Sequence, residues 1–419
     1  MKRLTATLAL ALALALGLCA CAQAADPITL GLNYPRTGSY QNEGRDQMRG
    51  ALLAIDEINA GGGVLGRSLR LSSHDSASRS KKAVANVDKL ADEGAAMLFG
   101  GASSAVAIAA GKRAAERGLL YFGAVTYSND TTGKDGHRYM FREGISAWMS
   151  ARVLGQYLAQ KHPGSRYFYV TSDYTWGHTT EASLRQATGT QDGAQHPGRR
   201  IPFPAVGLAH YRDSLTQAAA SDVQVLVLVL FGRDLERAMR VAHDLGLTRR
   251  MQIVAPNLTL NVIEQAGPSV MEGVVGTEPW TWRVPELENS ARGKAFVNDY
   301  VKRYQKYPSS SAASAYGIVY QWADAVRRAN SLDSEALIRA LEGHRYALLK
   351  GEQYWRAFDH QNVQRIYAVK VKPRSEVLKD PLKQDYFEII HQLDGDQAAP
   401  SLDEWKAERR AAGKPPLLQ

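Results

Sequence analysis

The chain has 419 residues, of which 45% are hydrophobic and 22% charged, a composition typical of globular proteins and a length sufficient for two domains. The formal net charge is +9, yet basic residues are dispersed among acidic ones, as in GKRAAERG and WKAERRAAGK. Nucleic-acid-binding surfaces gather such charge into stripes with interleaved aromatic residues, so no nucleic-acid partner is predicted.

The first 24 residues have the order of a secretory signal peptide. A positive start (1–3) precedes an almost pure Leu/Ala run (4–18), and Ala22-Gln23-Ala24 is an A-x-A cleavage motif. The apolar run is too short for a comfortable membrane span, which argues against a permanent anchor. Export to the periplasm with cleavage after Ala24 is therefore predicted. The alternative is that LCAC acts as a lipobox and Cys21 carries a lipid.

Strand and helix patterns alternate from residue 28 onward. Met48, Leu52, Ile55 and Ile58 recur at spacings of four and three, as on one face of a helix. The following glycines, GGGVLG at 61–66, match G-x-G-x-x-G, but a dinucleotide-binding turn follows a strand and opens a helix. Here the order is helix, glycines, strand, so a helix end is predicted. The expected strands of this series are 28–34, 70–75, 95–100 and 119–125, with helices near 48–58, 84–90, 104–116 and 145–160.

A second series begins near residue 166. Its strand VQVLVLVLF (223–231) is apolar almost throughout, as expected of a strand buried on both faces, and is too short for a membrane helix. Two such series predict an α/β fold of two doubly wound lobes with parallel sheets. The other expected elements are strands at 166–172 and 251–257, helices at 289–306, 311–329 and 334–342, a late strand at 363–372, and a polar, peripheral C-terminal extension at 374–419.

Four stretches resemble the branched-chain amino-acid-type solute-binding proteins of ABC importers, which have the type I periplasmic binding protein fold. The likeness runs from about 28 to 373 and rests on TGSYQNEGRDQMRGALLAIDEINAGGGVLGRSLRL, LFGGASSAVAIAAGKRAAERGLLYF, VTSDYTWGHTTEASLR and YWRAFDHQNVQRIYAVKVK. It implies a monomer without catalysis or cofactor, which traps a small molecule by hinge closure and presents it to a membrane permease and its ATPase.

The same resemblance implies three interlobe crossings, near Glu143-Gly144, Thr277-Glu278 and Lys350-Gly351. The first lobe would then comprise 26–144 and 276–350, and the second 145–275 and 351–373. Ligand would bind between the lobes, outside the carboxyl ends of the strands.

Candidate ligand-binding residues lie at these strand ends. Ser103 or Ser104 begins a helix, where free amides and a serine hydroxyl suit a carboxylate, and the family's carboxylate-binding serine aligns with Ser104. The resemblance places the family's ligand-binding threonine at Thr126 or Tyr127. It adds Trp176 and Phe231 at positions where the family usually has tyrosines. Its first loop contributes Tyr40 and Glu43.

Asn257 is the informative departure, because amino-acid binders carry a glutamate there that pairs with the α-ammonium group. A neutral amide loses a charge-assisted bond worth about 1.5–3 kcal/mol. Together with Phe231 in place of a tyrosine, this favours a carboxylate ligand with an aromatic or branched apolar body. A true amino-acid binder remains an alternative, in which Glu43, Asp173 or Glu278 would pair with the ammonium group.

Other chemistry is not supported by the sequence. His74-Asp75 and Asp359-His360 are isolated pairs without a third ligand at metal-site spacing, and no hydrolase, zinc-protease or Walker motif occurs. The glycosylation sequons at Asn129 and Asn257 lie in the expected cleft loops and are set aside. Two other functions stay open: an exported sensor of the same fold with a separate membrane signalling partner, and an exported hydrolase, for which Ser103 and Ser104 lack a motif.

Overall fold

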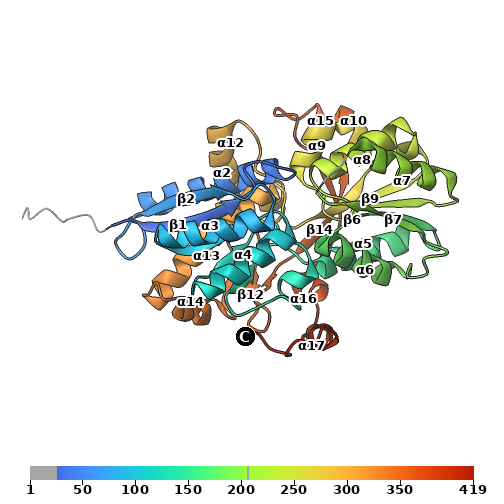
Figure 1. Cartoon of the computed structure of the whole chain (residues 1–419). Helices are drawn as coiled ribbons and strands as arrows, with labels where there is room; N and C mark the ends of the chain where they lie inside the picture. Colours follow the sequence, from blue (N-terminus) through green and yellow to red (C-terminus); the bar gives the residue numbers. More distant parts are fainter. Residues whose placement is uncertain (1–25, 205–206) are drawn as a thin grey trace, which may run out of the picture.

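The computed structural model describes residues 26–204 and 207–419. The predicted signal peptide, with Cys19 and Cys21, lies outside the described residues. The described chain forms two lobes, each a β-sheet covered by helices (Figure 1). In this part of the chain, no helix combines the length and hydropathy that a membrane span requires.

The first lobe contains a five-stranded sheet in which all neighbouring strands are parallel. Helices α3 (Ser80–Asp92) and α4 (Ser104–Glu116) pack together beside it, as do α2 (Gln41–Ala60) and α13 (Ser310–Ala329). Gly50 allows α2 to approach α13 closely, because a Cβ there would lie 2.1 Å from the carbonyl oxygen of Ala312. In spatial order the strands are β2 (Leu69–Asp75), β1 (Ile28–Tyr34), β3 (Ala95–Gly100), β4 (Tyr121–Gly123) and β5 (Met140–Arg142).

The second lobe, on the right in Figure 1, contains a seven-stranded sheet. In spatial order its strands are β15 (Phe387–Leu393), β14 (Ile366–Val371), β10 (Val275–Glu278), β9 (Gln252–Ala255), β8 (Val225–Val229), β6 (Tyr167–Asp173) and β7 (Gly198–Pro202). β14 runs antiparallel to β10 and β15, and the other pairs are parallel. Every residue of β8 is buried, which confirms the apolar run at 223–231 as a central strand. The two-lobed α/β fold is confirmed.

Further helices cover the second sheet and extend the first lobe. α5 and α6 pack against each other, and α5 also contacts β14 and β10; α7, α8 and α9 form a separate group. Their bounds, with those of the remaining helices before residue 345, are α5 (Ala147–Lys161), α6 (Thr175–Thr188), α7 (Leu208–Ala220), α8 (Arg233–Asp244), α9 (Leu260–Ala266), α10 (Pro268–Met271), α11 (Val284–Leu287), α12 (Ala291–Tyr304), α14 (Ser334–Leu341), η1 (Asn129–Thr131) and η2 (Leu247–Arg249).

The GGGVLG stretch ends helix α2, as predicted from the order of the elements. Gly62 and Gly63 have φ of +91° and +77°, and their amides donate to the carbonyls of Asn59 and Ile58. A Cβ at Gly63 would lie 2.1 Å from the carbonyl oxygen of Arg67. Strand β2 follows, so the motif closes a helix and does not open one.

A small antiparallel sheet lies where the chain passes between the lobes. It consists of β11 (Arg345–Tyr346), β12 (Gln353–Trp355) and β13 (Asn362–Val363). The indole of Trp355 packs edge-on against Phe122 and Phe141 of the first lobe, at centroid distances of 5.7 and 5.6 Å. Residues 353–363 therefore contact the first lobe, although the resemblance assigns 351–373 to the second. The other lobe boundaries remain predictions.

The segment from residue 374 is built into the fold, which differs from the peripheral extension expected from its polar composition. β15 pairs with β14 at the edge of the second sheet, and α17 (Leu402–Ala411) follows the short helices α15 (Arg374–Val377) and α16 (Gly395–Ala398). Trp405 is 2% exposed and donates from Nε1 to the carbonyl oxygen of Thr132 at 2.8 Å. One edge strand and one buried indole anchor a segment whose average composition is polar.

Candidate functional site

The predicted site residues meet where the two lobes face each other. Each follows the carboxyl end of a strand or opens the first long helix. Ser103 and Ser104 follow β3, Thr126 and Tyr127 follow β4, Trp176 follows β6, Phe231 follows β8, Asn257 follows β9, and Tyr40 and Glu43 stand at the start of α2. All nine are at most 5% exposed.

Aromatic rings from both lobes surround Phe231. The ring centroids of Tyr40, Tyr127 and Trp176 lie 5.4, 6.0 and 6.0 Å from that of Phe231, in edge-on geometry. Tyr40 and Tyr127 belong to the first lobe, and Trp176 and Phe231 to the second. Edge-to-face pairs at these distances are favourable contacts, so the rings hold the lobes against each other.

Two further rings, which the sequence did not reveal, complete this aromatic cluster. Phe203 stacks on Tyr174 at 4.3 Å and on Tyr40 at 5.6 Å, and the hydroxyls of Tyr40 and Tyr174 are 3.1 Å apart. Tyr174 could have been found from SDYTWG, since it lies two residues before Trp176. Phe203 lies in a proline-flanked loop with no periodic pattern. The aromatic cluster comprises Tyr40, Tyr127, Tyr174, Trp176, Phe203 and Phe231.

The N-terminus of α4 carries one hydroxyl that is free to bind. Ser103 is the N-cap residue, but its side chain makes no capping bond. Its buried Oγ makes no hydrogen bond of ordinary geometry in the described chain, although it lies near Tyr174 and lowers the pKa of that residue. Ser104 Oγ accepts from the amide of Ser128 at 3.0 Å, and Thr126 Oγ1 pairs with Thr131 Oγ1 at 2.7 Å. Free amides at a helix N-terminus favour an anion, and of the three predicted hydroxyls at this end of α4 only that of Ser103 lacks such a hydrogen bond.

The side-chain amide of Asn257 is hydrogen-bonded to the aromatic cluster through its oxygen but not through its nitrogen. Its Oδ1 accepts from Nε1 of Trp176 at 3.2 Å. Its buried Nδ2 has no partner within the described part of the chain. The amide therefore offers a hydrogen-bond donor to a ligand.

Two buried carboxyl groups, Glu43 and Glu278, lie beside the cluster. Glu43 accepts from Thr259 Oγ1 of the second lobe at 3.2 Å, and burial raises its pKa to about 7. Glu278, at the end of β10, is 2% exposed, and burial raises its pKa well above the usual range, with the charge of Glu43 adding to the rise. Asp173 is different, since its side chain is 47% exposed and pairs with His178 at 2.7 Å.

Hydrogen bonds also join the lobes around the aromatic cluster. Ser128 Oγ lies 3.0 Å from Thr175 Oγ1, and Asn129 Nδ2 donates to Ser183 Oγ at 3.0 Å. Gly232 permits a close approach, because its φ is +56° and a Cβ there would lie 2.8 Å from the ring of Tyr40. The lobes are therefore in contact around the aromatic cluster in this structure.

The two His-Asp pairs have hydrogen-bonding roles outside the cluster. His74 pairs with Glu93 at 2.8 Å. His360 stacks on Phe141 with ring centroids 4.0 Å apart, and its Nε2 lies 3.0 Å from Glu342. Next to it, Gln361 accepts from the buried guanidinium of Arg142 at 2.6 Å. The Asp359-His360 stretch therefore supports the passage between the lobes.

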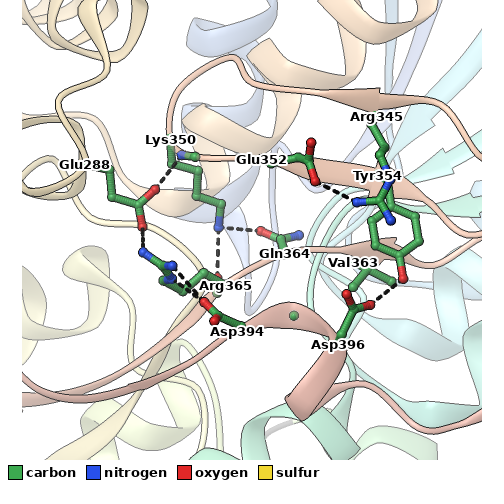
Figure 2. A pocket seen from close by; sticks show the side chains of 12 residues that line it. Glu288, Arg345, Lys350, Glu352, Tyr354, Val363, Gln364, Arg365, Asp394 and Asp396 are labelled. Carbon is green, nitrogen blue, oxygen red and sulfur yellow. Dashed lines mark hydrogen bonds and ion pairs between the residues drawn. The ribbon is translucent and has the colours of Figure 1, made fainter.

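A cavity of about 290 Å³ opens beside this passage, away from the predicted site residues (Figure 2). Lys350 is buried there and donates to Gln364 at 2.7 Å, and burial lowers its pKa to about 8. Arg365 bridges Glu288 and Asp394 at 3.0 and 2.7 Å. Because the charged side chains in Figure 2 already have hydrogen-bond or ion-pair partners within the protein, this cavity is weaker as a ligand site than the aromatic cluster.

The protein has two lobes, each a helix-covered sheet, and side chains that could bind a ligand lie at the strand ends where the lobes meet. This arrangement is typical of bilobal solute-binding proteins. The family model described as periplasmic binding protein matches residues 27–376. The chain belongs to this family of non-enzymatic binding proteins, and it is similar to binding proteins of branched-chain amino acids and of their ABC transporters.

Three similar proteins illustrate the likeness. The leucine-, isoleucine-, valine-, threonine- and alanine-binding protein of Pseudomonas aeruginosa is 23% identical over 77% of this chain and 84% of its own. A periplasmic binding protein of Burkholderia mallei has a TM-score of 0.81 at 24% identity, covering 91% and 98% of the two chains. A solute-binding protein of Rhodopseudomonas palustris, in complex with 3,4-dihydroxybenzoic acid, has a TM-score of 0.74 at 18% identity, covering 88% and 98%.

Proposed function

We propose that the protein captures a small carboxylate with an aromatic or branched apolar body in the interlobe cleft and delivers it to the permease and ATPase of an ABC importer. The main observation in support is the Ser103 hydroxyl at the N-terminus of α4, which is buried and makes no hydrogen bond of ordinary geometry in the described chain. Tyr174 connects this end of the helix to the aromatic cluster, because its hydroxyl lies 3.1 Å from that of Tyr40 and its pKa, which burial raises, is lowered by the neighbouring side chains of Tyr40 and Ser103.

The shape of the site supports both parts of such a ligand. A carboxylate would accept from Ser103 and from first-turn amides of α4, where the helix dipole favours negative charge. The apolar body would lie among the rings of the aromatic cluster, with the free Nδ2 of Asn257 as a further donor. Relatives of this fold include binders of aliphatic amino acids and of an aromatic acid, and both kinds of ligand carry a carboxylate.

Isothermal titration calorimetry with matched compounds tests this function. The panel pairs benzoate, 3,4-dihydroxybenzoate, 3-phenylpropanoate, 4-methylpentanoate, phenylalanine and leucine with the primary amide of each. At least one carboxylate should bind with 1:1 saturation, and its amide should bind at least tenfold more weakly. At a hundredfold excess over the Kd, the bound ligand should stabilise the fold by about 2.7 kcal/mol. Equal binding of amide and carboxylate, or steady conversion of a ligand to product, would contradict the proposal.

A further inference from the structure

The carboxyl group of Glu278 is buried at the end of β10 and has no ion-pair partner. Neither of its oxygens accepts a hydrogen bond of ordinary geometry from residues 26–204 or 207–419. Lys350 lowers its pKa only from a distance, since the Lys350 ammonium group donates to Gln364 and to the carbonyls of Pro279 and Arg365. A buried ionised carboxylate without a hydrogen-bonded partner is costly, so this group requires either a proton or a cation.

Unpartnered hydroxyls from a separate helix lie in the same region. The Oγ atoms of Ser310, Ser311 and Ser314, in the first turns of α13, are buried and make no hydrogen bond of ordinary geometry in the described chain; Ser314 lies near Glu143, whose pKa it lowers. Burial raises the pKa of both Tyr127 and Glu278, and the Ser310 hydroxyl lowers both, which places Ser310 near each. Tyr127 belongs to the aromatic cluster, so Ser310 and Glu278 border the proposed ligand site.

We propose that Glu278 forms a cation subsite, with the α13 serine hydroxyls as additional acceptors, and that the ligand carries a protonated amine there. The subsite rests on the proposed function, because the amine belongs to the same carboxylate ligand. An ammonium group has N–H donors that match a carboxylate and several hydroxyls, whereas a quaternary ammonium has none.

This subsite changes the ligand expected from Asn257 and Phe231. The two neutral residues remove the acid and hydroxyl that the family uses on the second lobe, and the sequence therefore favoured a ligand without an amine. Glu278, at the end of β10 in the second sheet, supplies a carboxyl group in their place. Of the three acids considered from the sequence, Asp173 is exposed and Glu43 already accepts from Thr259, which leaves Glu278 as the unpartnered one.

Paired ligands and a charge-removing variant test the subsite. The probes are leucine against 4-methylpentanoate, and phenylalanine against 3-phenylpropanoate and N,N,N-trimethylphenylalanine. Each is titrated into the wild type, Glu278→Gln, Ser310→Ala and the surface control Glu335→Gln. Glu278→Gln keeps the side-chain size and removes only the charge. Circular dichroism and thermal melting verify that each variant is folded.

The amine-bearing member of at least one pair should bind the wild type at least tenfold more tightly than its deaminated acid or trimethylated analogue. Glu278→Gln should abolish this preference, Ser310→Ala should reduce it, and Glu335→Gln should leave it unchanged. Because Glu278 must ionise to pair with the amine, calorimetry in buffers of different ionisation enthalpy should show proton release that Glu278→Gln removes.

The outcomes separate this inference from the proposed function. If the deaminated acids bind as well as or better than the amines, or if Glu278→Gln keeps the preference, the cation subsite is wrong and the carboxylate function stands. If the trimethylated analogue binds best, the rings and not Glu278 select the cation, and the inference is again wrong. If no carboxylate in the panel binds, the proposed function fails and the subsite fails with it.

Discussion

Replacing Gly232 with alanine should weaken ligand binding through a contact that exists only when the lobes meet. Gly232 precedes α8 in the second lobe, and its added Cβ would lie 2.8 Å from Tyr40 Cδ1 and 3.1 Å from the carbonyl oxygen of Ser39, both in the first lobe. Rotation of the Tyr40 ring cannot relieve the backbone contact. The substitution therefore opposes the closed arrangement of the lobes.

The magnitude follows from two separable costs. Glycine at φ +56° and ψ −131° occupies a region that costs other residues about 1–3 kcal/mol, whether or not the lobes touch. Overpacking against Tyr40 and Ser39 costs about 1–3 kcal/mol, but only in the closed form. At about 1.4 kcal/mol per tenfold, the second cost raises the Kd by roughly 5- to 150-fold.

Gly246→Ala is the matched control. Gly246 also has a positive φ, +70°, but a Cβ there meets nothing within 4 Å. Calorimetry with the tightest ligand of the panel, and urea denaturation of the free proteins, should show that both variants lose stability while only Gly232→Ala loses affinity. Equal affinities in the two variants would refute the argument that Gly232 permits closure.

Three further substitutions have defined outcomes. Trp176→Ala removes one ring of the aromatic cluster and the hydrogen-bond donor to Asn257 Oδ1. Calorimetry should therefore show at least tenfold weaker ligand binding, with the circular dichroism spectrum retained. Unchanged affinity would mean that Trp176 only packs in the core. Trp405→Ala should lower the free energy of unfolding by about 3–5 kcal/mol. Leu417→Ala, at a side chain that is 53% exposed, should leave it unchanged. Equal effects of the two substitutions in urea denaturation would mean that the docking of α17 does not stabilise the fold. The pKa of Glu43 rises from 4.5 to about 7 on folding. Its protonated form therefore stabilises the fold fully below pH 4.5, and this contribution, on the order of 3 kcal/mol, is lost as the pH rises through 7. Glu43→Gln should lose less stability than the wild type between pH 4.5 and 8, and parallel curves of unfolding free energy against pH would contradict this.

Local patterns were sufficient to predict the sheets and their helices. The buried run of β8, the helix face at Met48 to Ile58 and the glycines that end α2 each carry their information within a few neighbouring residues. The C-terminal segment was harder, because only the two end residues of β15 are buried and α17 is held by few side chains, among them Trp405 and Arg409. Its docking depends on distant carbonyl groups such as that of Thr132, which no local pattern reveals.

The site was predictable where residues follow strand ends, and less so where partners come from distant segments. Trp176, Phe231 and Asn257 lie at such ends and meet as expected. Phe203 lacks any pattern, and its role depends on stacking with Tyr40 of the other lobe. Glu278 could be suggested from the sequence only as one of three acids, because its lack of a partner depends on how β10 and α13 meet.

A crystal structure with the tightest carboxylate of the panel tests the central claim most directly. The account predicts that the ligand carboxylate lies within hydrogen-bonding distance of Ser103 Oγ at the N-terminus of α4, with its apolar body against the rings around Phe231. A ligand bound instead in the cavity lined by Lys350 and Arg365 (Figure 2), or with its carboxylate away from α4, would contradict it.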